Sequence, residues 1–142
     1  MHIAIVARDG GLLAFRSMPD AWEGSRDIAI AKARTAAFFS SDQNALTSRI
    51  VGVLSQAHGE DGEGAAGPLW GIWASNQVGI TGGPNFRNGI ITFPGGIPLY
   101  KGGALVGGIG VSGDGVDQDE AVALAGSVGF RPGATVANPA EL

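Results

Sequence analysis

The chain contains no cysteine, which excludes disulfides, thiolate metal sites and cysteine nucleophiles. Its two histidines, His2 and His58, form no metal-binding motif. Nine Lys and Arg stand against thirteen Asp and Glu, a formal net charge of −4. Nucleic-acid binders need a cationic excess to displace counterions from phosphates, so we expect no nucleic-acid partner.

Long hydrophobic runs are also missing. No apolar stretch reaches the 18 or more residues that a transmembrane helix needs, so we expect no membrane partner. Arg8 and Asp9 interrupt the N-terminal apolar run too early for a signal peptide. The cytoplasm is therefore the favoured compartment, although a lack of cysteine also fits secreted proteins.

Glycine is abundant, with 25 in 142 residues, and charged residues make up only 15% of the chain. The glycines lie mostly between apolar runs, where tight turns and close backbone approaches require them. The length predicts a single domain whose hydrophobic core is large enough to be stable without disulfides or bound metals. We assign the domain to residues 1–130, with an expanded loop region at 55–88 and a flexible tail at 131–142.

Hydrophobic periodicity predicts the order strand, strand, helix, helix, strands, helix. The expected strands are 2–7, 12–16, 89–93, 97–100 and 104–111, with a short strand or lid at 69–74. The expected helices run from 25 to 38 or 39, around 46–54, and from 117 to 126. Short Gly-containing turns force neighbouring strands to pair antiparallel, so we predict an α+β fold.

Few side chains point to chemistry. Lys32 is a charge close to the apolar face of an Ala-rich helix, where it can snorkel to solvent, meet an anionic ligand, or pair with Asp9 or Asp119. Tyr100, the only tyrosine, is a core residue or an iron ligand. Ser112 directly follows a strand, but with so few histidines to act as a base, a serine hydrolase is disfavoured.

Two acidic clusters favour ordinary roles. His58, Asp61 and the Glu60–Glu63 pair lie in a Gly-rich loop, and a solvated loop explains them better than a metal cage does. The carboxylates at 114, 117, 119 and 120 precede or begin the last helix, where they complement its macrodipole. A polar wall of a pocket remains the alternative for the second cluster.

Three segments carry a family resemblance: Asp27–Phe39, Phe93–Leu99, and Val106–Gly113 followed by Asp117–Glu120. They are similar, in order and spacing, to the Lys-Ala-x-Thr-Ala helix, the Gly-Gly-x-Pro turn and the Gly-Val-Ser-Gly…Gln-Asp-Glu segment of the GlcG/HbpS-like haem-binding family. That family also includes the PduO C-terminal domain. The resemblance covers most of residues 3–126.

The resemblance implies a profilin-like antiparallel sheet of about five strands with helices on both faces, and homo-oligomers. Family domains usually begin with a helix that is missing before the first strand here. Either the chain is a piece of a longer protein, or a partner chain covers the exposed sheet face. The motif positions that carry over are Asp9, Lys32, Thr35, Gly96, Pro98, Ser112, Gly113 and Asp119.

The first functional hypothesis, implied by the resemblance, is haem or tetrapyrrole binding, with haem handling or redox sensing as its purpose. Trp70 and Trp73 would supply an apolar slot, Lys32 or Arg34 a cation for the haem carboxylates, and His58 the iron ligand, with Tyr100 and His2 behind it. The cofactor-binding residues predicted are Lys32, Arg34, Trp70, Trp73, Tyr100, Ser112 and Gly113.

Two alternatives stay open. One is an assembly or structural domain of a larger protein or complex. The other is an enzyme that binds a small organic acid, with Lys32 as anion holder and Asp9, Ser112 and Asp119 as further catalytic candidates. A shared fold does not by itself decide among these functions.

Overall fold

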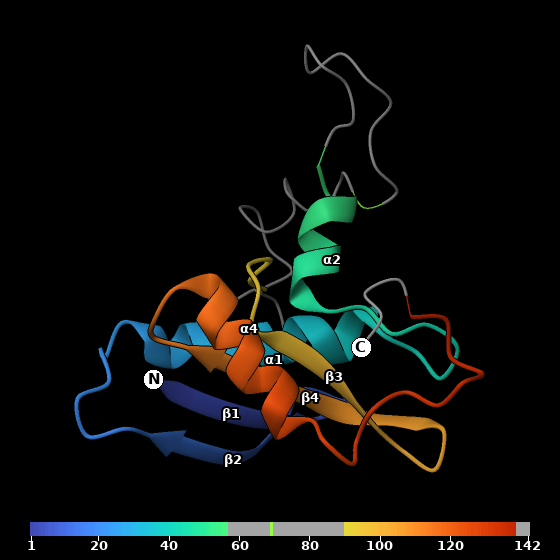
Figure 1. Cartoon of the computed structure of the whole chain (residues 1–142), viewed down its shortest axis with the longest axis horizontal. Helices are drawn as coiled ribbons and strands as arrows, with labels where there is room; N and C mark the ends of the chain where they lie inside the picture. The colour runs from blue at the N-terminus through green and yellow to red at the C-terminus, as the bar shows by residue number, and fades with distance from the viewer. Residues whose placement is uncertain (57–68, 70–89, 139–142) are drawn as a thin grey trace.

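The computed structural model describes residues 1–56, 69 and 90–138 of the chain. Four strands form one antiparallel sheet: β1 (His2–Ala7), β2 (Leu12–Ser17), β3 (Gly96–Lys101) and β4 (Ala104–Ser112). Their order across the sheet is β2-β1-β4-β3 (Figure 1). The α+β class and both predicted hairpins are confirmed, but the described sheet has four strands rather than about five.

The expected strand at 89–93 is wrong for the residues that the structure describes. Residues 90–95 are irregular. Two of their backbone groups bond to helix side chains, and the Gly95 carbonyl oxygen accepts from the Val111 N–H of β4 at 2.9 Å. Thr35 Oγ1 accepts a hydrogen bond from the Ile91 N–H at 3.0 Å, and Ser48 Oγ donates to the Phe93 carbonyl oxygen at 2.5 Å. The apolar run at 90–93 has the sequence pattern of a strand. Its path is set instead by the hydroxyl groups of Thr35 and Ser48, which lie far away in the sequence.

Three helices complete the described structure: α1 (Ser25–Phe39), α2 (Ser48–Leu54) and α4 (Val116–Gly126). The predicted helix positions are confirmed within a few residues. Ser25 is the first helical residue of α1, and Gly24 occupies the N-cap position without a side-chain hydrogen bond. Thr47 caps α2, since its hydroxyl oxygen accepts from the Ile50 N–H.

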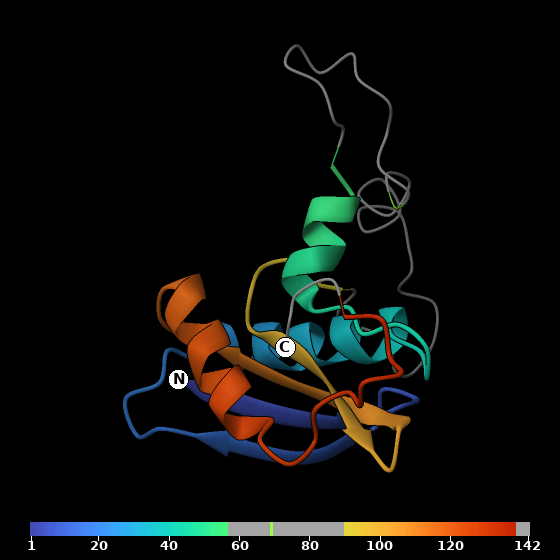
Figure 2. The same ribbon diagram turned by 45° about the vertical axis from the view of Figure 1, so that its right-hand side comes forward.

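Helix α1 lies directly on one face of the sheet, on β1 and β4 (Figure 2). Ala29, Ala33 and Ala37 pack there against Ala4 and Val6. The contact with β4 is closer still. A Cβ on Gly108 or Gly110 of β4 would overlap with a carbonyl oxygen of α1. The glycines predicted to allow close packing on this strand therefore do so, and the small alanines of α1 are the other half of the same fit.

Helix α4 covers the opposite face, but only over β3 and β4. Ala123 of α4 packs there against Ile97, Leu99, Ile109 and Val111. Beside α4, on the β1–β2 half, two hollows of about 340 and 210 Å³ lie open. We call this region the open sheet face; it is lined by Ile3, Ile5, Leu13, Ala14, Phe15, Arg16, Val106 and Phe130 together with Val6, Leu99, Gly107 and Gly126.

The described part of the C-terminal segment is docked, in contrast to the flexible tail expected from residue 131. Val136 is buried against Ala45, Tyr100 and Leu105. The Ala137 carbonyl oxygen accepts from the Ala45 N–H at 2.8 Å. The sequence of this segment is polar, which suggests a tail. One buried valine and two backbone hydrogen bonds hold it, and such contacts produce little hydrophobic periodicity in the sequence.

Among the described helices, none has both the length and the hydropathy needed to cross a lipid bilayer.

Candidate functional site

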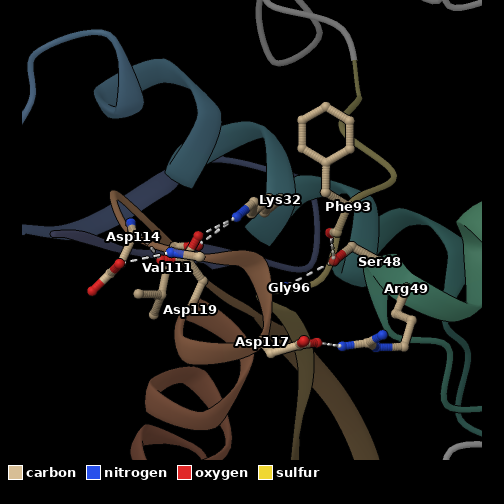
Figure 3. A network of polar contacts seen from close by, with 10 residues as sticks. Lys32, Ser48, Arg49, Phe93, Gly96, Val111, Asp114, Asp117 and Asp119 are labelled. Carbon is tan, nitrogen blue, oxygen red and sulfur yellow. Dashed lines mark hydrogen bonds and ion pairs between the residues drawn. The ribbon is translucent and has the colours of Figure 1, made fainter.

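A buried ion pair lies where α1, β4 and α4 meet. The Lys32 ammonium donates to Asp119 Oδ2 at 2.9 Å and to the Val111 carbonyl oxygen at 3.0 Å (Figure 3). The second oxygen of Asp119 accepts from the Asp114 N–H at 3.2 Å. Both side chains are nearly inaccessible, at 1% and 2% exposure. Of the partners that the sequence offered for Lys32, the structure selects Asp119.

Tight backbone surrounds this pair, which we call the buried junction. Gly95 has φ +118°, and a Cβ there would lie 2.6 Å from the Val111 carbonyl oxygen and 3.1 Å from the Lys32 ammonium. A Cβ on Gly96 would overlap with the Lys32 carbonyl oxygen. The junction therefore has no room for a ligand. The ion pair and its hydrogen bonds link three elements, α1, β4 and α4.

Asp9 lies at the other end of the sheet. It follows β1, whose last residue Ala7 pairs with Gly107, whereas the buried junction is at Val111 of the same strand β4. Four strand residues separate these levels by about 13 Å. Asp9 accepts a bond from the Gly11 N–H at 2.9 Å and shapes the turn. The structure therefore does not bring Asp9 and Asp119 together as an acid/base pair on one small substrate.

Arg34 is also held away from the buried junction. Its Nε donates to the Gly10 carbonyl oxygen at 3.0 Å, which ties α1 to the β1–β2 turn. Partial burial lowers the pKa of Arg34 below its ordinary value, an effect that the nearby Asp27 carboxylate opposes. Arg34 is a half-buried cation, but it lies on the turn side of α1.

The two described candidates for an iron ligand are both engaged. Tyr100 is 1% exposed, and its hydroxyl donates to the Ser41 and Asn44 carbonyl oxygens. Burial raises the pKa of Tyr100 above its ordinary value, which disfavours the phenolate that binds iron. His2 is equally buried, with Nδ1 2.8 Å from Ser17 Oγ and Nε2 2.8 Å from the Trp22 carbonyl oxygen.

The remaining predicted site residues divide into two groups. Ser112 is buried at the end of β4, and Gly113 follows it with φ +136°, against the backbone of Met1. His58, Trp70 and Trp73 lie outside the described residues. No group of three or more His, Cys, Asp or Glu within the described ranges is arranged to hold a metal ion.

An open groove lies on the other side of the 93–96 turn from the buried junction. Its volume is about 360 Å³, within the range of about 300–1,000 Å³ typical of small-molecule sites. One wall is α2, the second is the segment 92–94, and the third is the start of α4. We call it the α2 groove; it is lined by Gly52, Ser55, Gln56, Thr92, Phe93, Pro94 and Val116.

The walls of the α2 groove are apolar or uncharged, and two apolar side chains are presented to solvent. Phe93 is 49% and Val116 42% exposed. An ion pair beside the groove joins α2 to α4. Arg49 Nη2 lies 2.7 Å from Glu120 Oε2 and 2.5 Å from Asp117 Oδ1.

Hydrogen bonds to Glu120 and then Asp117 raise the pKa of Arg49 above its ordinary value. These exposed pairs set the spacing of the two helices rather than supply a free charge to the groove.

Sequence reasoning did not identify this groove. In the sequence, Phe93 ends the predicted strand 89–93 and begins the Gly-Gly turn motif, and the described lining residues of α2 carry no chemically reactive side chain. Gln56 and Thr92 line the groove, and the chain between them contains the predicted residues His58, Trp70 and Trp73.

A family model described as "Haem degrading protein HbpS-like" matches residues 1–127. This chain belongs to the HbpS-like family. The resemblance inferred from the three sequence segments is thereby confirmed.

Curated relatives and a solved structure agree with this assignment. An uncharacterized 15.0 kDa protein from the dhaT-dhaS intergenic region of Citrobacter freundii is 29% identical over 120 residues, or 84% of this chain and 68% of its own. The corrinoid adenosyltransferase PduO of the same organism is 32% identical over 85% of this chain, but the match spans only 29% of PduO.

The solved structure is a PduOC:heme complex, which is 26% identical and superimposes with a TM-score of 0.66. The match covers 93% of this chain and 79% of PduOC.

Proposed function

We propose that this HbpS-like protein binds haem or a related tetrapyrrole in the α2 groove. The observation that carries the proposal is an open groove of about 360 Å³, whose described walls are uncharged and mostly apolar in surface, in a chain of the HbpS-like family. The structural likeness to a PduOC:heme complex supports the same ligand class. A flat apolar macrocycle needs an apolar slot of this kind.

The described residues of the groove fit the macrocycle of haem better than its iron. Phe93, Pro94 and Val116 present apolar surface suited to the macrocycle. Among the groove-lining residues that the structure describes, none is a His, Cys, Met or Tyr that would ligate iron. His58, two residues after the groove residue Gln56, stays the predicted ligand. His58→Ala is expected to shift the Soret band of a hemin complex if the prediction holds; an unchanged spectrum and affinity would remove His58.

The experiment is a titration of the whole chain with hemin, followed in the Soret region, with serum albumin competing for loosely held hemin. We expect saturation at one hemin per chain. Val116→Asp should weaken binding at least about tenfold, because it places a charge in an apolar wall. The control Val128→Asp alters a 69% exposed valine outside the groove lining and should bind like the wild type. Unsaturable binding, or equal loss in both variants, would refute the proposal.

Haem handling or redox sensing is the finer part of the proposal, and the family description, which speaks of haem degradation, supports it. The loaded protein should then change its Soret band on exposure to hydrogen peroxide differently from hemin on albumin. Identical time courses would leave binding as the function and remove this finer role.

A second candidate function, assembly, is favoured by the open sheet face. Leu13 is 67%, Phe130 40% and Val106 38% exposed, and all three line one hollow. Contiguous exposed apolar surface of this kind marks association sites, and we propose that a second copy of the chain covers it. Light scattering should show a dimer or larger species that Leu13→Asp converts to monomers; a monomeric wild type would refute this.

The small-acid enzyme has the least support. Lys32 and Asp119 are buried and paired with each other, and Asp9 lies at the opposite end of the sheet. The described lining of the α2 groove includes no cationic side chain that would hold a carboxylate.

A further inference from the structure

Helices α2 and α4 form two walls of the α2 groove, and the side chain of Arg49 joins them. Arg49 Nε donates to Glu120 Oε2 at 2.8 Å, and Arg49 Nη2 donates to Asp117 Oδ1. Figure 3 shows the Arg49 guanidinium directed at Asp117. Within the described residues, these pairs are the hydrogen bonds and ion pairs that connect α2 with α4. We call Arg49, Asp117 and Glu120 the α2–α4 clasp.

The clasp residues lie next to residues that line the groove. Arg49 precedes the lining residue Gly52 by three positions, which places both on the same side of α2. Asp117 directly follows the lining residue Val116 at the start of α4. Glu120 is three positions after Asp117, so the two carboxylates share one side of α4. The clasp therefore bridges the two helices beside the groove.

Other contacts attach α2 to the segment that forms the remaining wall. Ser48 donates to the Phe93 carbonyl oxygen and accepts from the Gly96 N–H at 2.8 Å. Gly52 packs so closely that a Cβ would overlap with the Thr92 carbonyl oxygen. A helix attached to one element can tilt about that attachment, whereas attachment to a second element fixes its direction. The clasp supplies that second attachment, from α2 to α4.

The clasp is partly exposed, unlike the buried junction. The exposed fraction is 41% for Arg49, 78% for Asp117 and 18% for Glu120. Ion pairs of this kind are weak and are screened by salt. A ligand that fits the spacing set by the clasp meets a preorganised groove. Without the clasp, part of the binding free energy is spent on bringing the two walls together.

We propose that Arg49 is a positioning residue of the α2 groove: with Asp117 and Glu120 it holds the α2 and α4 walls at the spacing that suits a flat tetrapyrrole. Tetrapyrrole affinity then depends on ionic strength through the protein. This inference rests on the proposed function and adds to it a residue that acts on the ligand through the walls rather than by contact.

The test measures hemin affinity of the whole chain at low and high salt, with serum albumin as competitor. Arg49→Met should raise the dissociation constant about threefold to fivefold at low salt, the range that a partly exposed ion pair can supply. In salt of about 1 M, where the Debye length is about 3 Å, the wild type should approach the variant.

The matched control is Arg8→Met. It removes another exposed arginine that pairs with a carboxylate, that of Asp42, and neither residue is among the described lining of the groove. This variant should keep the affinity of the wild type and its salt dependence. Circular dichroism and the midpoint of thermal unfolding confirm that each variant is folded.

Two further measurements separate positioning from other roles of Arg49. Arg49→Glu brings three carboxylates together and should weaken binding more than Arg49→Met does. The double variant Arg49→Glu/Glu120→Arg keeps one cation between two carboxylates with two positions exchanged, so it should restore most of the affinity. Hemin dimethyl ester should lose the same factor on Arg49→Met as hemin, because the clasp acts on the walls and not on the ligand carboxylates.

The outcomes separate the inference from the proposed function. If hemin does not saturate the wild type, the proposed function itself fails. If hemin saturates but Arg49→Met binds like the wild type or like Arg8→Met, the inference is overturned and the proposed function stands. A loss for hemin but not for its dimethyl ester would mean that Arg49 contacts the ligand directly, and a loss that the charge exchange does not relieve would assign it to packing. Either result overturns the inference as well.

Discussion

The buried junction and the α2 groove lie on either side of one turn, residues 93–96, yet they are built from opposite kinds of residue. The junction holds a Lys–Asp ion pair that is almost fully buried. The part of the groove lining that the structure describes has an aromatic ring, a proline, a valine and several uncharged polar residues, but no charged side chain. The charged residues Lys32 and Asp119 were candidates for a ligand site in the sequence, but in the structure they pair with each other and link α1 to α4. The surface available to a ligand is made of residues without reactive groups.

The physical reason for this division is the cost of burying charge. A buried ammonium or carboxylate is tolerated only when it is paired and hydrogen-bonded, and Lys32 and Asp119 use each other and two backbone groups for that purpose. An apolar groove that stays open forgoes about 25 cal/mol for each Å² of apolar surface left in water, and a flat ligand that covers it recovers that free energy. The following substitutions test the comparison, in order of decreasing effect on stability.

Lys32→Met should have the largest effect. It leaves Asp119 buried without its cation, and breaking such a pair typically costs about 3–5 kcal/mol. Urea unfolding, monitored by circular dichroism, measures the loss. The double variant Lys32→Met/Asp119→Leu should recover a large part of it, because no uncompensated charge remains. A stable Lys32→Met protein that has lost ligand binding would instead make Lys32 a ligand-binding residue and reverse the comparison.

Thr35→Val should come next. The hydroxyl of Thr35 accepts from the Ile91 N–H, and its removal leaves that donor unsatisfied at a cost of about 1–3 kcal/mol. The segment that carries Phe93 would then be less firmly held, so hemin affinity should fall as well. Thr92→Val, on a residue that lines the groove, is the control for a lost hydroxyl in this segment. Equal effects of the two variants would argue against a positioning role for Thr35.

Arg49→Met should have a small effect, about 0–1 kcal/mol, because its ion pairs with Asp117 and Glu120 are partly exposed. The wild type should lose the same increment in high salt, where the pairs are screened. Comparing unfolding free energies of both proteins at low and high salt checks this. A loss that persists at high salt would show that Arg49 acts by packing rather than by charge.

Phe93→Ala should have the smallest effect on stability, below about 0.5 kcal/mol, since the ring is half exposed and buried contacts are few. The same variant is expected to have the largest effect on tetrapyrrole affinity. Thermal unfolding measured beside the titration separates the two. A destabilisation comparable to that of Thr35→Val would mean that the ring is part of the core and not a ligand surface.

Much of the fold followed from local patterns. Residue spacing predicts the Ala-rich helix at 25–39, the hairpins and the glycine-rich strand β4. It can do so because side-chain periodicity and turn preferences depend on residues close together in the sequence. Family membership followed from the order of three short segments, and the match over residues 1–127 confirmed it.

The candidate site did not follow in the same way. The ion pair of Lys32 with Asp119 joins residues 87 positions apart, and the bond from Ser48 to Phe93 joins residues 45 apart. No local pattern encodes which of several carboxylates a lysine meets. The irregular path of residues 90–95 could not be predicted either, since its backbone partners come from α1, α2 and β4, which are distant in the sequence.

The sequence by itself determined which residues are apolar, where helices and turns form, and which family the chain belongs to. Only the tertiary structure decided which polar residues pair with one another in the interior and which apolar surface stays exposed to solvent. That decision depends on packing: α1 approaches β4 until backbone meets backbone, Lys32 is enclosed, and the 93–96 turn is pressed against it. The ring of Phe93 and the walls around it remain outside this packing, and they form the surface at which we propose that the ligand binds.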